Sequence, residues 1–311
     1  MTPSDAPAPL VSVVIPTFNY ARFVTEAVDS VLAQTYPSLE VVVVDDGSTD
    51  DTREVLARYS DRIRYIYQPN AGLPAARNTG IKAARGEFIG LLDSDDIFHP
   101  RKFELQMRYM LAHPEVGMLA TDNFTGQSPC WEDPPADPAV EPVPVEAIVT
   151  RSRFGVCGVV IRRECFEEVG LFDESLRSAE DREMWIRLAA RFPVMKLQAK
   201  TFWYRPHAGS MSRAAAKMEH YEFQALDRAF TLPTLRDRWW LERRARSVAA
   251  FSAGLRYRDA GMHGTALHRI IRSLWLWPLP HPHEDAKPFA RTKLLFLAPF
   301  RLIAGLARPS P

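Results

Sequence analysis

From Leu10 onward, short apolar runs alternate with longer amphipathic segments, and this alternation restricts the fold more than any other feature. The runs rich in β-branched residues cover 11–15, 40–44, 62–67 and 87–92, and segments with helical periodicity cover 21–34, 51–59, 74–84 and 101–112. Continuous apolar runs of this length are typical of strands buried on both faces. Strands that alternate with helices form βαβ units with right-handed crossovers. The sequence therefore predicts an α/β fold whose Rossmann-like, mostly parallel central sheet is flanked by helices.

Polar residues follow each of the four predicted strands. PTFN follows the first strand, DDGSTDD the second, QPNAG the third and DSDD the fourth. The carboxyl ends of parallel strands lie along one edge of a sheet, and the ligands of such sheets bind beyond that edge. The sequence therefore predicts that these four segments form one site, of a kind that suits a nucleotide.

The composition is that of a globular protein. The chain has 311 residues, 46% of them hydrophobic and 25% charged, which is enough for one large domain with an accessory segment. Cys130, Cys157 and Cys165 show neither CxxC nor metal-finger spacing, so we expect no disulfide framework, no structural zinc and a reducing compartment. The amino terminus lacks a basic region followed by a long apolar stretch, which predicts no signal peptide and a cytoplasmic location.

The charge is distributed unevenly along the chain. Residues 1–199 contain 20 Lys and Arg against 30 Asp and Glu, whereas residues 200–311 contain 19 against 8. In this basic segment arginines are mixed with tryptophans in RIIRSLWLWPLP (269–280), and KLLFLAPFRLIAGLA (293–307) adds an apolar patch. Without a nucleic-acid motif, the mixture favours an anionic membrane surface over nucleic acid as a partner. Both patches are shorter than the roughly 20 residues of a membrane span. Packing on the rest of the chain or in a homo-oligomer is the alternative.

The middle of the sequence contains a proline-rich acidic stretch at 128–144, which cannot continue a helix or a central strand. We interpret it as an exposed loop, either a connector or a mobile cover over a site. A strand-like FGVCGVVI (154–161) and a helical AEDREMWIRLAARF (179–192) follow, and the strand pattern stops after YRPHAGSMS (204–212).

Several of these segments, taken in order, resemble a known family. SVVIPTFNYARFVTEAVDSVLAQTYPSLEVVVVDDGSTDDT is followed by NAGLPAARNTGIKAARGEFIGLLDSDD and then by a late AED. This order is similar to that of the family 2 glycosyltransferases with the GT-A fold, and it is far more specific than a lone DxD element. The resemblance covers about residues 10–212. It implies a catalytic domain over 1–212, followed by a helical region over 213–311 that associates with a membrane or oligomerises.

The DSDD element is the predicted metal site. Carboxylates at a strand end suit a hard divalent cation that bridges two phosphates, and the resemblance implies Mn²⁺ or Mg²⁺ on the diphosphate of the donor. Asp95 is the leading ligand, Asp93 lies nearer the sugar or ribose with Ser94 beside it, and Asp96 is an alternative ligand. Some relatives carry a histidine as a third ligand at the position of His207, which must be neutral to bind metal. The structural alternative applies to one of these carboxylates: Asp96 could cap the following helix.

The other predicted donor-binding residues belong to the segments after the first three strands and to the region near residue 207. The resemblance assigns the nucleotide base to Asp46, with Asp45 as a further acceptor at the same strand end. Asn19 and Asp50 are expected to cap helices. For Thr17 and Arg77 a purely structural role is the alternative. The full predicted set is Pro16, Thr17, Asp45, Asp46, Arg77, Asn78, Asp93, Ser94, Arg205 and Ser210.

The resemblance also assigns a catalytic role to the Glu180–Asp181 pair. An inverting transfer needs a carboxylate that removes the proton of the acceptor hydroxyl. We expect Asp181 to be this base and Glu180 to orient the acceptor, whereas capping of the helix that starts there is the structural alternative.

These residues together predict an inverting glycosyltransferase. The expected donor is a nucleotide sugar, with UDP favoured, and the expected acceptor is a saccharide or lipid-linked hydroxyl in cell-envelope or extracellular polysaccharide synthesis. A nucleotidyltransferase and a non-catalytic nucleotide-sugar binding module are the alternatives, although the intact Glu180–Asp181 pair argues against the second. A dinucleotide-dependent oxidoreductase is disfavoured because PTFNYA stands where GxGxxG is expected.

Overall fold

A computed structural model describes residues 7–126, 128–129, 131–151, 153–207 and 215–279. It divides the chain into two compact units. Unit 1 comprises Met1–Pro144, Arg153–Arg177 and Arg187–Ala208, and unit 2 comprises Val145–Ser152, Ser178–Ile186 and Gly209–Pro311. Unit 2 therefore includes two segments that precede residue 213, where the sequence analysis places the start of the C-terminal region.

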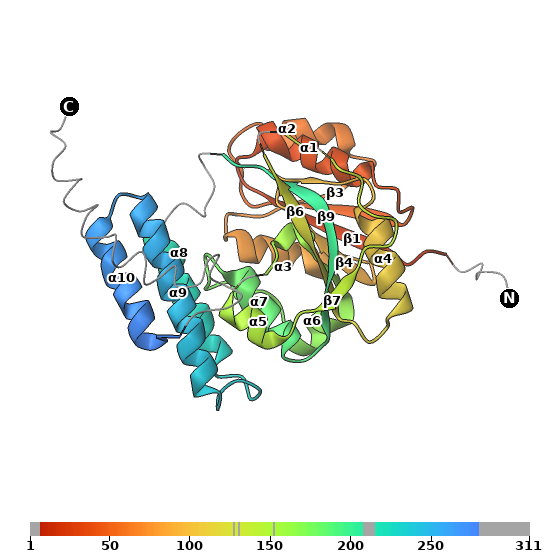
Figure 1. Ribbon diagram of the computed structural model, residues 1–311. Coiled ribbons are helices and arrows are strands. Elements are labelled where there is room, and N and C mark those ends of the chain that lie inside the picture. Colours follow the sequence, from red (N-terminus) through yellow and green to blue (C-terminus); the bar gives the residue numbers. More distant parts are fainter. Residues whose placement is uncertain (1–6, 127, 130, 152, 208–214, 280–311) are drawn as a thin grey trace. The chain divides into compact units, whose positions relative to one another are not determined.

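Unit 1 contains a mixed nine-stranded sheet (Figure 1). Its order is β3–β2–β1–β4–β8–β6–β9–β5, and β7 pairs with β9. The strands are β1 (Val11–Thr17), β2 (Leu39–Asp45), β3 (Arg64–Tyr67), β4 (Phe88–Leu91), β5 (Ile97–Phe98), β6 (Met118–Thr125), β7 (Val140–Pro142), β8 (Val160–Arg162) and β9 (Val194–Tyr204).

The four strands predicted from apolar runs form the parallel half of this sheet. β1 pairs in parallel with β2 and β4, and β2 pairs in parallel with β3. All seven residues of β1 are buried, as expected for a central strand covered on both faces. The other half adds antiparallel pairs of β8 with β4 and β6, so the sheet as a whole is mixed.

The helices of the parallel half lie on both faces of the sheet. They are α1 (Ala21–Leu32), α2 (Thr52–Leu56) with the short 3₁₀ helix η1 (Ala57–Tyr59), and α3 (Leu73–Ala83). The chain moves outward from β1 to β3 and then returns past β1 to β4. Because right-handed crossovers in opposite directions use opposite faces, α1 and α2 lie on one side and α3 on the other (Figure 1). The direction reverses between β1 and β4, where ligands of open α/β sheets bind.

The remaining helical elements of unit 1 are α4 (Lys102–Ala112), the 3₁₀ helix η2 (Val156–Gly158) and α6 (Arg163–Val169). The strand predicted over 154–161 is only partly formed, because η2 precedes β8. A side chain at Gly158 would place its Cβ 2.7 Å from the carbonyl oxygen of Thr121, so the chain passes close to β6 at this point.

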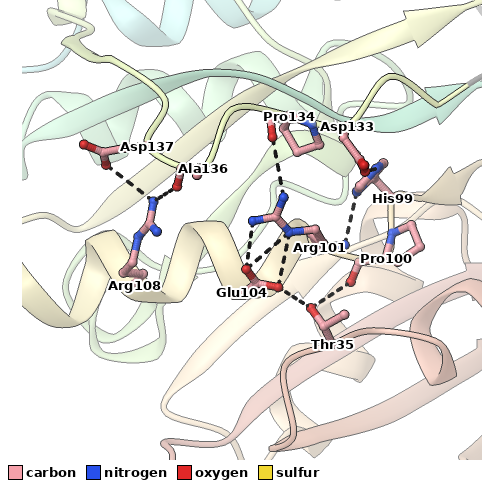
Figure 2. A network of polar contacts seen from close by, with 10 residues as sticks. All are labelled: Thr35, His99, Pro100, Arg101, Glu104, Arg108, Asp133, Pro134, Ala136 and Asp137. Atoms are coloured by element: carbon pink, nitrogen blue, oxygen red, sulfur yellow. Dashed lines mark hydrogen bonds and ion pairs between the residues drawn. The ribbon is translucent and has the colours of Figure 1, made fainter. Parts of the chain in front are cut away.

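The proline-rich loop is attached to α4 and the turn before it (Figure 2). Arg101 donates to the carbonyl of Pro134 at 3.5 Å, and Arg108 donates to the carbonyl of Ala136. The ring of Trp131 packs edge-on against His99 with centroids 5.2 Å apart. These contacts in the described part of the loop favour the connector interpretation over the mobile cover.

Unit 2 is helical. It contains α5 (Val145–Thr150), the first part of α7 (Glu180–Ala189), α8 (Ala215–Ala229), α9 (Trp239–Asp259) and α10 (His263–Leu276). The last two form an antiparallel pair in which Arg243 Nε donates to the carbonyl of Leu276 at 3.2 Å and Ser247 Oγ to that of Ser273 at 2.7 Å. Across the described ranges, no helix combines the length and the apolar character that a membrane crossing requires.

Candidate functional site

The predicted polar segments converge at the reversal point of the sheet in unit 1. β1 ends at Thr17, paired with Asp45 at the end of β2, and β4 ends just before the DSDD turn. The backbone N–H of Asp96 donates to the carbonyl of Asp93 at 3.0 Å, which closes this turn. The buried parallel strands therefore present all three carboxyl ends, with their acidic residues, at one edge.

Asp93 is oriented by two contacts. Arg77 of α3 is almost fully buried, and its Nη2 lies 2.7 Å from Asp93 Oδ1. The backbone N–H of Asp93 donates to Cys157 Sγ at 3.3 Å. Arg77 therefore forms the ion pair that is its structural alternative. This ion pair fixes the carboxylate of Asp93, the first residue of DSDD. Ser94, the next residue, is buried.

The side chain of Asp95 contacts a histidine from the last sequence segment of unit 1. His207 Nε2 lies 2.8 Å from Asp95 Oδ2 although the two residues are 112 positions apart. The rings of Tyr20 and Phe23 lie 5.8 and 5.5 Å from the imidazole, centroid to centroid. The structure therefore joins two of the residues that the sequence analysis names as metal ligands.

Arg205 organises the same turn through its backbone and side chain. Its N–H donates to Asp96 Oδ1 at 3.0 Å, and its Nε donates to the carbonyl of Asp95 at 2.8 Å. Its Nη2 forms an ion pair with Glu26 at 2.8 Å. The guanidinium of Arg205 thus bonds groups of the protein itself. Arg205 therefore supports the DSDD turn, in addition to the phosphate binding that is predicted for it.

The carboxylates of the turn are crowded, and their pKa values reflect it. Burial, and next the charge of Asp93, raise the pKa of Asp95. Burial, followed by the charges of Asp93 and Asp95, raises the pKa of Asp96 to about 8. A divalent cation would offset this repulsion, because a bound ion is the largest local charge of such a site.

Two candidate ligand sets for a cation lie at this turn. Ligand atoms of Asp93, Asp96 and Cys157 lie within 4.8 Å of one another, but burial also raises the pKa of the Cys157 thiol far above its ordinary range. His207 Nε2 and Asp95 Oδ2, which lie 2.8 Å apart, would supply one nitrogen and one oxygen ligand to a divalent cation. The side chains of Asp93 and Asp95 are 32% and 21% exposed. The predicted set of Asp93, Asp95 and His207 is more open to the phosphates of a donor, although among the described residues it is Asp93, Asp96 and Cys157 whose ligand atoms are gathered together.

Side chains at the end of β2 bond β3 and the loop that precedes α3. Asp45 accepts from the backbone of Ser48 at 2.8 Å and from the hydroxyl of Tyr65 at 2.6 Å. Asp46 accepts from the side chain of Gln68 and from the backbone N–H groups of Ala71 and Gly72 at 2.7–2.9 Å. Both carboxylates are buried. They shape the loops at the predicted base site, and their contact with a base stays a prediction.

The expected helix caps differ in outcome. Asp50 accepts from the backbone N–H of Thr52 at 3.1 Å and from that of Ala21 at 3.0 Å, so it holds the starts of both α2 and α1. The cap predicted for Asn19 is wrong, because its Oδ1 accepts from the backbone N–H of Thr49 at 2.8 Å. Asp96 does not cap α4 either, since that helix begins after Arg101 without a side-chain cap.

Two further predicted donor residues have different surroundings. Within the described part of the chain, Thr17 Oγ1 is buried and has no hydrogen-bond partner. A buried hydroxyl of this kind is costly unless a ligand or a water satisfies it; its neighbour Pro16 belongs to the same buried strand. Asn78, by contrast, bonds Phe172 and Glu174 through its amide, which anchors that segment to α3.

The predicted catalytic pair starts α7 and belongs to unit 2. Glu180 is buried and Asp181 is half-buried. The residue before them, Ala179, has a φ of 57°, a left-handed conformation that is uncommon outside glycine. Ser210 lies outside the described residues.

One residue of this site, Cys157, is not among those predicted from the sequence. Cys157 Sγ lies 3.2 Å from Asp96 Oδ2 as well as near the backbone of Asp93, and it is 61 positions away from Asp96 in the chain. A single cysteine within an apolar run carries no signal that would assign it to the DSDD turn.

Comparison with known proteins shows the family of this chain. Residues 12–166 match the model of a family described as "Glycosyl transferase family 2", and residues 148–237 match "Glycosyltransferase like family 2". An uncharacterised glycosyltransferase of Rickettsia prowazekii is 32% identical over 223 residues, which are 69% of this chain and 70% of the relative. The putative teichuronic acid biosynthesis glycosyltransferase TuaG of Bacillus subtilis is 30% identical over 232 residues, 71% of this chain and 89% of TuaG.

Solved structures show the same fold at lower identity. TarS of S. aureus, in complex with UDP-GlcNAc, has a TM-score of 0.58 and 19% identity, with 86% of this chain and 91% of TarS covered. The mannosyltransferase PcManGT of Pyrobaculum calidifontis, in complex with GDP-Man and Mn²⁺, has a TM-score of 0.59 and 20% identity, with 96% of this chain and 86% of that chain covered.

Proposed function

This chain belongs to glycosyltransferase family 2 and is a glycosyltransferase, and we propose that it transfers a sugar from a UDP-sugar to a hydroxyl acceptor with inversion, assisted by Mn²⁺ or Mg²⁺. The observation that carries the proposal is the 2.8 Å approach of His207 to Asp95 beside Asp93. It provides oxygen and nitrogen ligands for a divalent cation at the edge of the sheet where nucleotides bind.

The choice of UDP rests on the residues beyond β1 and β2 and on one structural relative. Thr17 offers a buried hydroxyl without a partner in the described residues, and Asp45 and Asp46 lie at the neighbouring strand end. TarS was solved with UDP-GlcNAc, whereas PcManGT was solved with GDP-Man. We therefore propose a UDP-sugar and treat a GDP-sugar as an outcome that the binding experiment distinguishes.

The proposed reaction is a single displacement. The acceptor oxygen bonds to the anomeric carbon while the bond from that carbon to the diphosphate breaks, and Asp181 takes the hydroxyl proton. Asp93, Asp95 and His207 would hold the divalent ion, which stabilises the charge on the departing UDP. Arg77 keeps Asp93 in place by their ion pair at 2.7 Å.

Binding of nucleotides to the purified protein tests the donor site. We expect UDP to bind much more tightly with Mn²⁺ than with EDTA, and more tightly than GDP under the same conditions, as measured by calorimetry. A panel of UDP-sugars incubated with Mn²⁺ then identifies the donor by release of UDP. Release of pyrophosphate would instead indicate a nucleotidyltransferase, and tighter binding of GDP would overturn the choice of base.

Asp181→Asn tests the proposed base. Transfer should fall by roughly 10²–10⁴-fold, the usual contribution of a positioned base, whereas the affinity for UDP with Mn²⁺ should stay within twofold. Asp237→Asn is the control, because Asp237 is an exposed acidic residue of the same unit. Unchanged transfer in Asp181→Asn would remove Asp181 from the mechanism.

We also propose that unit 2 contacts an anionic membrane surface and that the acceptor is lipid-linked. Trp239 at the start of α9 is 68% exposed, and Trp275 near the end of α10 is 71% exposed. Arg243 connects the two ends: its guanidinium lies over the ring of Trp275, 5.5 Å from the centroid, and bonds the carbonyl of Leu276. Exposed tryptophans beside arginines are typical of interfacial contacts. In that arrangement the enzyme would work on the cytoplasmic face of the membrane.

A further inference from the structure

The first turn of α7 is fixed by the residue that follows the proposed base. Arg182 is buried and bonds two elements of unit 2 besides its own helix. Its Nη2 and Nε donate to the carbonyls of Val149 and Ile148 in α5, at 2.8 and 3.3 Å. Its Nη1 forms an ion pair with Glu222 of α8 at 2.8 Å. The guanidinium therefore connects the start of α7 to two other helices.

Glu222 is in turn held by the next helix. Its second carboxylate oxygen lies 2.6 Å from Arg256 Nη2 of α9. The resulting chain, Arg182–Glu222–Arg256, consists of two cations that share one carboxylate, with Glu222 only 14% exposed. Burial lowers the pKa of Arg182, and the charges of Glu222 and Asp181 oppose that shift. Removing the negative charge of Glu222 would leave the buried guanidinium of Arg182 without this carboxylate partner, which disrupts such a site strongly.

The backbone before the proposed base supports the same interpretation. Ala179 has a φ of 57°, and its carbonyl accepts from the N–H of Glu183 at 3.1 Å, so a strained residue begins the helix. Backbone strain of this kind persists only where surrounding contacts enforce it. The contacts of Arg182, three residues further on, provide such enforcement within unit 2.

We propose that Glu222 and Arg256 are positioning residues for catalysis: α8 and α9 hold Arg182, and Arg182 holds the Glu180–Asp181 turn in its reactive place. The inference rests on the proposed role of Asp181 as the base. On this proposal, the C-terminal helices α8 and α9 contribute to catalysis by positioning the base.

Two measurements on Glu222→Gln test the proposal independently. Hydrogen–deuterium exchange of the peptide that contains residues 178–183 should become at least about tenfold faster, because local opening is limited by the contacts that are lost. Release of UDP from the UDP-sugar that the wild type turns over should fall by about 10- to 100-fold in kcat, since a small misplacement of a reacting group has this effect. The affinity for UDP with Mn²⁺ should stay within twofold. Glu222→Asp should recover part of both losses.

Glu219→Gln is the matched control. Glu219 lies on the same helix and its side chain is 10% exposed against 14% for Glu222, but it bonds Tyr257 and Arg269 and not Arg182. We expect it to lower thermal stability about as much as Glu222→Gln while leaving exchange of the 178–183 peptide and kcat within twofold of wild type. Equal effects of the two substitutions, or unchanged exchange in Glu222→Gln, would overturn the inference. Faster exchange without any loss of turnover would instead contradict the role of Asp181 as the base.

Discussion

Asp95 and Asp96 are adjacent in the chain, but their side chains have different surroundings. Asp95 is partly exposed and faces His207, whereas Asp96 is buried between the backbone of Arg205 and the thiol of Cys157. Burial, with the charges of Asp93 and Asp95, raises the pKa of Asp96 to about 8, and burial raises the pKa of Asp95 as well. Asp95 is therefore suited to bind a cation, and Asp96 to shape the turn that presents it.

Asp95→Asn should abolish the response of the protein to Mn²⁺. A ligand that binds only the folded state raises its stability, so the thermal midpoint of the wild type should rise on addition of Mn²⁺ with UDP. In Asp95→Asn this rise should disappear and UDP-sugar turnover should be lost. Without metal the variant should be as stable as the wild type, because the substitution removes a charge from a crowded cluster. Differential scanning fluorimetry with and without Mn²⁺ measures both effects.

Asp50→Asn provides the opposite pattern as a control. Asp50 bonds the backbone at the starts of α1 and α2, so its loss should lower the thermal midpoint and leave the Mn²⁺ response intact. A normal Mn²⁺ response in Asp95→Asn would show that another set of ligands holds the ion.

Lys102 makes stability depend on pH. The amine is fully buried, bonds Gln106 Oε1 at 2.7 Å, and burial lowers its pKa to about 7. An unfolded lysine titrates near 10.4, so between these values the unfolded state binds more protons and stability rises with pH. Below about pH 7 the amine is charged in both states and the cost of burying it is fully present.

The free energy of unfolding should therefore increase between pH 7 and 10 more steeply in the wild type than in Lys102→Met. The slope that Lys102 adds can reach about 1.4 kcal/mol per pH unit. Urea denaturation at pH 6.5, 8 and 9.5 measures it, and Lys82→Met, at an exposed position on α3, should keep the wild-type slope. Parallel pH profiles for the wild type and Lys102→Met would contradict the assignment.

At the scale of elements, α3 packs against β1 through a glycine. A Cβ at Gly80 would lie 2.2 Å from Cγ1 of Val14, so helix and strand approach more closely than any other residue permits. The same helix carries Arg77, which holds Asp93 across the reversal point of the sheet. The distance between α3 and the sheet therefore also determines the position of a predicted ligand.

Gly80→Ala should destabilise the protein by about 1–3 kcal/mol, as overpacking of a core does. Adding Val14→Ala should restore part of this loss, because it removes the methyl groups that clash. Gly264→Ala near the start of α10, where nothing lies within 4 Å of the added Cβ, should be neutral or stabilising by up to about 1 kcal/mol. Urea denaturation of Gly80→Ala, Val14→Ala, their double variant and Gly264→Ala decides this, and strictly additive effects of the pair at 14 and 80 would refute the contact.

At the scale of the whole molecule, the predicted donor site and the predicted base belong to different compact units. Asp93, Asp95 and His207 lie in unit 1, whereas Glu180 and Asp181 lie in unit 2 with the tryptophans that we assign to the membrane.

Vesicle flotation tests the membrane contact. The wild type should float with phosphatidylglycerol vesicles at low salt and detach at high salt, since each basic residue near such a surface contributes about 1 kcal/mol. Trp239→Ser with Trp275→Ser should weaken flotation, whereas Met262→Ser, at the exposed opposite end of the α9–α10 pair, should not. A form that ends after Leu279 tests the predicted patch at 293–307, which lies outside the described residues. Equal flotation of all point variants would exclude this surface as the contact.

The sequence alone determined the features that depend on short stretches of chain. Runs such as 11–15 and 40–44 have the length and the β-branched content typical of buried strands, and their alternation with amphipathic segments predicted the parallel half of the sheet. Because the ends of such strands share one edge, the DSDD segment could be placed at the ligand site before any contact was known. The family resemblance then named Asp95, His207 and Asp181, whose roles stay predictions.

Only the tertiary structure decided which distant side chains meet. Cys157 reaches the DSDD turn because η2 interrupts the expected strand beside β4, and Asn19 bonds the next loop instead of capping α1. Likewise, nothing local in α8 or α9 indicates that Glu222 and Arg256 support Arg182. Periodicity reports which face of an element is buried, whereas the partners of a buried polar group depend on how all elements pack together, and that packing brings residues more than a hundred positions apart into contact.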